Sequence, residues 1–115
     1  MINSNNWHDS YLEKIVIEYN KCLVELTDYN DKRVDIVCEG FRSIVYIGQY
    51  DENIIKDINI IESSDLIEKT KNSIKENYSY IETGLKQLEI ELIDDVKIQI
   101  IAEEFYLNEL KGRFI

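Results

Sequence analysis

Apolar residues recur at every second position over three stretches near the start of the chain. They are Ile15, Ile17 and Tyr19, then Cys22, Val24 and Leu26, then Val34, Ile36 and Cys38. Period two with β-branched residues predicts half-buried strands. Facing Tyr19 with Cys22, Ile17 with Val24 and Ile15 with Leu26 makes every pair apolar. This register predicts a hairpin whose two-residue loop is Asn20-Lys21, because Asn tolerates the positive φ of a tight turn.

The second and third stretches predict another hairpin. Its register places Leu26 beside Val34, Val24 beside Ile36 and Cys22 beside Cys38, with a polar loop over 27–33. A slip of one residue would turn these apolar faces outward, so the pattern specifies the register.

Two further strands are expected before the middle of the chain. The segment Phe41 to Tyr50 carries apolar residues on both faces, which is typical of a central strand covered on two sides. After a polar turn over 49–53, the segment Ile54 to Ile61 predicts another strand, with Ile54, Ile58 and Ile60 in phase.

The period then changes to that of a helix. Apolar positions recur at three and four residues, at Leu66, Ile67, Thr70, Ile74, Tyr78 and Ile81. Asp65 followed by Glu68 resembles a capping box, and Gly84 is a suitable helix end. This predicts a helix over about 64–83. One alternative is a longer helix that continues through Leu85, Leu88 and Leu92.

A strand after Gly84 is favoured, because Leu88, Ile90 and Leu92 alternate strictly with Glu89 and Glu91. Pairing Leu92 with Val96, Ile90 with Ile98 and Leu88 with Ile100 predicts a hairpin with the loop Ile93-Asp94-Asp95, and the final strand is expected to run to about Leu107. The predicted fold is α+β: an antiparallel sheet of about 6–7 strands with one main helix, about 64–83, packed on one face, in a single domain over 1–115.

The amino-acid composition of the chain argues against several classes of function. The chain has 115 residues, with 23 Asp and Glu against 13 Lys and Arg, and its net charge is −10. This charge argues against binding to nucleic acid or to an anionic membrane. The N-terminal segment has neither the basic nor the apolar region of a signal peptide, and no apolar run approaches the ~20 residues of a membrane helix. We therefore expect a cytoplasmic protein in which Cys22 and Cys38 are buried, reduced thiols.

The sequence offers little for catalysis. His8, the single histidine, lies in Trp7-His8-Asp9-Ser10, where an adjacent Asp could orient the imidazole as in a hydrolase. A local turn is the simpler interpretation, because the residues of catalytic triads are distant in sequence. Trp7 is expected to fill the core or to anchor a partner. No cofactor-binding or metal-binding motif is present, so we expect a protein without enzymatic activity, cofactor or metal.

Negative charge gathers near the C-terminus. From Glu82 to Glu109 there are eight acidic residues and two lysines, a net of −6. An acidic sheet face with aromatic residues suits the capture of a basic protein surface. The predicted partner-binding residues are Glu89, Glu91, Asp94, Asp95, Glu103, Glu104 and Tyr106.

The N-terminal half also carries a resemblance. The run Trp7-His8-Asp9-Ser10 leading into Ile15-Val16-Ile17, and then Cys38-Glu39-Gly40-Phe41, is similar to small bacterial immunity proteins encoded beside polymorphic or contact-dependent toxins. The resemblance implies a cytoplasmic inhibitor that neutralises a cognate toxin by direct binding and occlusion of its active site. The alternative is a small-molecule-binding domain with a pocket between the helix and the sheet.

Overall fold

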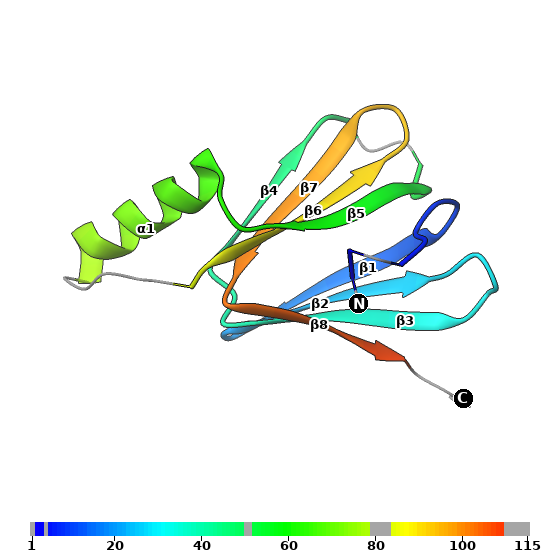
Figure 1. The fold of residues 1–115 in the computed structure, drawn as a ribbon, viewed down its shortest axis with the longest axis horizontal. Coiled ribbons are helices and arrows are strands. Elements are labelled where there is room, and N and C mark those ends of the chain that lie inside the picture. Colours follow the sequence, from blue (N-terminus) through cyan, green and yellow to red (C-terminus); the bar gives the residue numbers. More distant parts are fainter. Residues whose placement is uncertain (1, 4, 50–51, 79–83, 110–115) are drawn as a thin grey trace.

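The computed structural model describes residues 2–3, 5–49, 52–78 and 84–109, and in these ranges the chain forms eight strands and one helix. The elements in order are β1 (Tyr11–Glu18), β2 (Lys21–Thr27), β3 (Arg33–Glu39), β4 (Ser43–Ile47), β5 (Ile55–Ile61), α1 (Asp65–Tyr78), β6 (Lys86–Leu92), β7 (Val96–Ala102) and β8 (Glu104–Glu109). The strands pair antiparallel in two four-stranded sheets, ordered β1-β2-β3-β8 and β4-β7-β6-β5 (Figure 1). The predicted antiparallel α+β fold with one helix is confirmed, but its strands are divided between two sheets.

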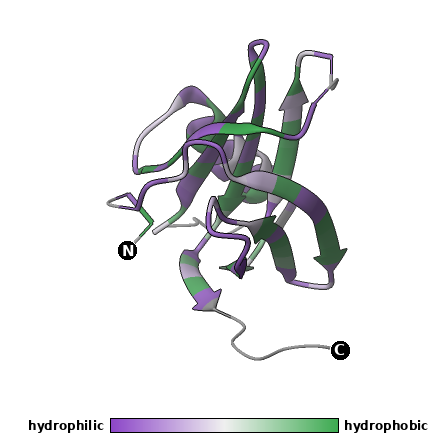
Figure 2. Ribbon diagram, turned by 90° about the vertical axis from the view of Figure 1, so that its right-hand side faces the viewer, coloured by the Kyte–Doolittle hydropathy of each residue, from purple (hydrophilic) through white to green (hydrophobic). Residues whose placement is uncertain are grey.

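The two sheets pack face to face around one hydrophobic core. Figure 2 shows hydrophobic and hydrophilic residues interspersed along the strands, and the inward-facing apolar residues of both sheets pack against each other. The first sheet contributes Cys22, Val24, Leu26, Val34, Ile36 and Cys38, and the second contributes Ile55, Ile58, Leu88, Ile90, Leu92, Val96, Ile98, Ile100 and Ala102. The polar set of each sheet therefore faces outward, on opposite sides of the sandwich.

Two of the three predicted hairpin registers are confirmed. In β2 and β3, Cys22 lies opposite Cys38 and Val24 lies opposite Ile36. In β6 and β7, Leu88 pairs with Ile100, Ile90 pairs with Ile98 and Leu92 pairs with Val96, around the predicted three-residue turn. The longer helix alternative, which would have absorbed residues 85–92, is therefore wrong.

The predicted register of the first hairpin is wrong by two residues. Cys22 pairs with Ile17 rather than with Tyr19, and the two residues between β1 and β2 are Tyr19 and Asn20. Asn20 adopts a φ of 63° at the second turn position, and Tyr19 is 99% exposed. A shift of two residues preserves the faces of a strand, so the apolar pattern alone does not detect it.

Two strand predictions near the sheet edges also need correction. β4 is an edge strand and not a central one, with Tyr46 and Ile47 about half exposed. The expected single last strand is divided at Glu103, where the chain leaves the second sheet at β7 and enters the first at β8. Before the break the even-numbered residues Ile100 and Ala102 face the core, and after it the odd-numbered residue Phe105 does. This change of alternation is visible in the sequence.

Helix α1 lies on the outward face of the second sheet. Its apolar residues Ile67 and Ile74 form a small cluster with Leu85 and with Ile101 of β7. The capping residue is Ser64 and not Asp65, because the Ser64 Oγ accepts a hydrogen bond from the Ile67 backbone N–H at 3.1 Å. Residues 79–83 of the predicted helix lie outside the described residues. Within the described ranges no helix has the length and apolar character needed to cross a membrane.

Candidate functional site

The outward face of the second sheet forms a regular array of side chains. Strand pairing aligns three rows across β5, β6, β7 and β4. The rows are Ile61, Gln87, Ile101 and Ser43; then Asn59, Glu89, Gln99 and Val45; then Asp57, Glu91, Lys97 and Ile47. Helix α1 packs over the first row through its contact with Ile101. The second and third rows lie beside the helix and consist mainly of polar side chains.

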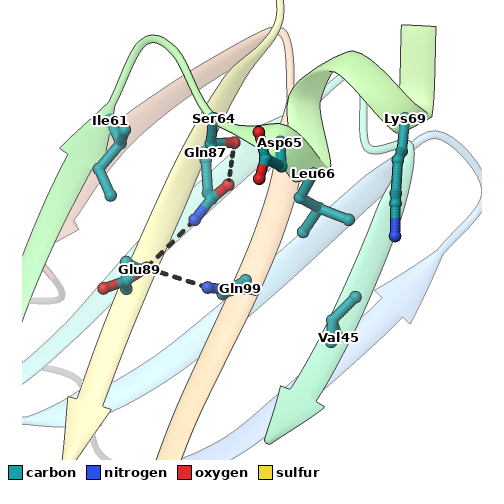
Figure 3. A pocket seen from close by; sticks show the side chains of 9 residues that line it. All are labelled: Val45, Ile61, Ser64, Asp65, Leu66, Lys69, Gln87, Glu89 and Gln99. Atoms are coloured by element: carbon teal, nitrogen blue, oxygen red, sulfur yellow. Dashed lines mark hydrogen bonds between the residues drawn. The ribbon is translucent and has the colours of Figure 1, made fainter. Parts of the chain in front are cut away.

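A chain of hydrogen bonds runs from the start of the helix across this face. The Ser64 Oγ donates to the Gln87 Oε1 at 2.5 Å, and the Gln87 Nε2 donates to the Glu89 Oε1 at 3.2 Å (Figure 3). From the next strand, the Gln99 Nε2 donates to the same Glu89 oxygen at 3.1 Å. The second oxygen of Glu89, Oε2, lies 3.7 Å from the Lys97 Nζ. Glu89 is thus held in one orientation by amides on both sides.

A pocket of about 460 Å³ lies above this chain, between the first turn of α1 and the sheet. Its lining residues are Val45, Ile61, Ser64, Asp65, Leu66, Lys69, Gln87, Glu89 and Gln99 (Figure 3). Gln87 is 2% exposed, whereas the side chain of Glu89 is 18% exposed. The pocket therefore has apolar walls and a polar floor whose carboxylate remains accessible, and its volume is in the range of small ligand sites.

The third row and the adjacent turn are strongly acidic. We name Asp57, Glu91, Asp94 and Asp95 the acidic rim. Asp57 lies opposite Glu91 in the β5–β6 register, and both turn aspartates are exposed. Asp94 and Asp95 adopt φ values of 65° and 62°, which Asp tolerates better than most residues. Lys97, opposite Glu91, is the basic residue of this row, so the rim carries four negative charges beside one positive charge.

The predicted partner-binding residues do not form one surface. Glu89 and Glu91 share the outward face of β6, as expected, and Asp94 and Asp95 are exposed in the turn that follows. Glu103 lies at the crossover between the sheets, where it forms an ion pair with Arg42.

Glu104 and Tyr106 lie on the outward face of the first sheet, because Phe105 and Leu107 of the same strand pack into the core. The expectation that they extend the same patch is therefore wrong. The Tyr106 hydroxyl donates to the Glu39 carboxylate at 3.0 Å, and this bond raises the pKa of Tyr106.

Sequence reasoning did not identify Asp57, Ser64, Gln87 or Gln99 as part of the site. Gln87 and Gln99 occupy the same outward phase as Glu89 in the two strands of a correctly predicted hairpin, so the register could have placed them together. A pocket between the helix and the sheet was part of the alternative hypothesis, but its lining residues could not be predicted, because they depend on where α1 docks.

The remaining candidates have structural explanations. Trp7 is 1% exposed and its Nε1 donates to the Ile2 carbonyl at 2.8 Å, so it fills the core. His8 lies in an exposed turn, with its Nδ1 3.2 Å from the Asp9 carboxylate. The thiols of Cys22 and Cys38 are free and buried, as expected. Within the described ranges, no group of three or more His, Cys, Asp or Glu residues is arranged to hold a metal ion.

Comparison of the chain with family models, with curated proteins and with solved structures finds no match. The geometry and charge of the second sheet's outward face are therefore the basis for a functional proposal.

Proposed function

We propose that this chain is a small, non-catalytic binding protein of the immunity type, which neutralises a basic partner such as a cognate toxin by direct binding. The observation that carries the proposal is the acidic rim. Asp57 and Glu91 pair on the outward face of β5 and β6, next to the row of Glu89, and Asp94 and Asp95 are exposed in the adjoining β6–β7 turn. The net charge of −10 adds a long-range field of the same sign.

Such a surface acts first on the rate of association. Complementary charge raises the rate at which a basic partner finds the correct face, and the effect weakens as salt shortens the Debye length. Inhibition then follows from occlusion, since a surface that occupies the basic active site of a toxin excludes its substrate. This mechanism requires no catalytic activity of the chain.

The direct test is co-expression with the basic protein encoded by the neighbouring reading frame. We expect that this neighbour arrests growth, that the chain restores growth, and that the two purify as a stable complex. The rim variant D57N/E91Q/D94N/D95N should protect less well. Its matched control, E13Q/E18Q/D31N/E104Q, removes the same number of charges from exposed positions elsewhere and should protect fully. Absence of both growth rescue and complex formation would contradict the proposal.

A second function, the binding of a small molecule, is supported by the pocket between α1 and the sheet. This function predicts that some metabolite raises the thermal unfolding temperature of the isolated chain. Substitutions in the pocket should remove that stabilisation, and the rim variant should retain it. The rim itself has no role in such a function, which is why the inhibitor is the leading proposal.

A further inference from the structure

The pocket beneath α1 lies next to the acidic rim on the same outward face. Asn59 and Glu89 pair in the second row, and Asp57 and Glu91 pair in the third. A partner attracted to the rim therefore reaches the pocket without reorientation. This proximity raises the question of which group of a basic protein the pocket would accept.

The floor of the pocket favours a planar cation. The Glu89 Oε1 already accepts two amide hydrogen bonds, while its Oε2 forms a longer ion pair with the Lys97 ammonium, at 3.7 Å. The carboxylate of Asp65 is a second acceptor at the helix start. The carboxylates of Glu89 and Asp65 thus offer hydrogen-bond acceptors in a site that the apolar side chains of Val45 and Leu66 shield from water on one side.

We propose that the pocket receives the side chain of one arginine from the basic protein partner, with its guanidinium paired to the Glu89 carboxylate. This proposal rests on the proposed function and names the anchor of its interface. The arginine stem lies along the apolar walls, and the fork of N–H donors meets the Oε2 of Glu89, where it takes the place of the Lys97 ammonium. Because Gln87 and Gln99 fix the carboxylate in advance, the pair forms with little loss of side-chain entropy.

Arginine is favoured over lysine for physical reasons. A guanidinium is weakly hydrated, bonds a carboxylate through two donors and packs its flat faces against apolar side chains. An ammonium keeps most of its hydration and makes one contact. Two lysines border the site: Lys69 reaches from α1 toward Val45, and Lys97 lies beside Glu89. Both are long, flexible side chains that move aside at low cost, and Lys97 lies opposite a second acid, Glu91, in the strand register.

The anchor and the rim then have separate kinetic roles. Exposed rim charges change mainly the association rate, whereas a charge pair removed from water changes the lifetime of a complex. The side chain of Glu89 is 18% exposed and is fixed by two amide hydrogen bonds, so it is the residue suited to an anchor.

The test uses a blocked arginine, N-acetyl-arginine-N-methylamide, as the probe. Two-dimensional ¹H–¹⁵N spectra of the full chain follow the side-chain amides of Gln87 and Gln99 during titration. We expect saturable shifts with a Kd on the order of 10 mM, as for a single residue without its interface. The blocked lysine should bind at least about threefold more weakly, and the blocked citrulline, which is neutral and nearly isosteric, should not saturate.

Variants locate the site. E89Q should abolish the response, and E18Q, at an exposed acid of β1 in the other sheet, should retain it. Thermal unfolding confirms that both variants are folded. Equal responses to arginine and citrulline in the wild-type chain would overturn the proposal, as would no saturation by arginine. Free L-arginine binding at least about tenfold more tightly than the blocked form would assign the pocket to a metabolite and also overturn it. None of these outcomes decides whether the chain neutralises a partner, which the co-expression test measures separately.

Discussion

Cys22 and Cys38 lie directly opposite each other on β2 and β3, and neither side chain is exposed. Their position follows from a register in which every inward pair of this hairpin is apolar. The hydrogen bond between the thiols and their burial raise the pKa of the Cys38 thiol. Burial keeps both thiols from a reagent, and the Cys38 thiol is also held away from the thiolate form in which cysteine reacts.

We therefore predict that neither cysteine is labelled by a thiol reagent in the native protein. Reaction should occur only through unfolding, at a rate that rises with urea and reaches that of a free thiol once the chain is unfolded. Mass spectrometry of samples quenched over minutes to hours measures this. Labelling of either cysteine within seconds under native conditions would contradict the buried pair.

The same thiol predicts a loss of stability in alkaline solution. The Cys38 pKa is raised in the folded chain, whereas the unfolded thiol ionises near pH 8.5. Above that pH the Cys38 thiol loses its proton in the unfolded state but keeps it in the folded state. The contribution of this thiol to the free energy of unfolding is therefore complete below about pH 8.5 and falls as the pH rises, by up to about 1.4 kcal/mol per pH unit. Urea unfolding between about pH 7 and 9.5 measures the slope. The C38A variant should show a shallower slope, and an identical slope would refute this cause.

Ser64 should contribute to stability through two bonds. Its Oγ caps α1 at Ile67 and also donates to the buried Gln87. We expect S64A to lower the free energy of unfolding by about 1 to 2 kcal/mol, with S63A, at the exposed neighbouring serine, nearly neutral. Urea denaturation of the two variants compares them directly. If both are equally stable, the cap does not contribute as described.

His8 is predicted to be dispensable. It is an exposed turn residue whose contact with Asp9 needs no further role. We expect H8A to leave the unfolding temperature and the protection of cells against the partner unchanged. Loss of protection with unchanged stability would instead favour the hydrolase hypothesis.

Local patterns predicted the fold best where turn chemistry and apolar pairing agree. The register and turn of the β6–β7 hairpin were predicted correctly because a three-residue turn places Leu92 beside Val96. The β1–β2 register was missed because a shift of two residues leaves every face unchanged, and only the turn at Asn20 distinguishes the alternatives.

Tertiary features were predicted less well. The division of strands into two sheets depends on the phase change at Glu103, a single residue in an otherwise regular alternation. For the same reason Glu104 and Tyr106 were assigned to a surface that they do not share. Glu89 and Glu91 were placed on one face correctly because the local register of the β6–β7 hairpin determines that face.

The most direct test of the account is the rate at which the chain associates with its basic partner. Stopped-flow association at low salt should be at least about tenfold slower for the rim variant D57N/E91Q/D94N/D95N than for the wild type, and raising the salt to ~0.5 M should reduce the difference. The charge-matched control E13Q/E18Q/D31N/E104Q should associate at close to the wild-type rate. Equal slowing of both variants would show that net charge alone steers the partner, and an unchanged rate for the rim variant would show that the acidic rim is not the binding face.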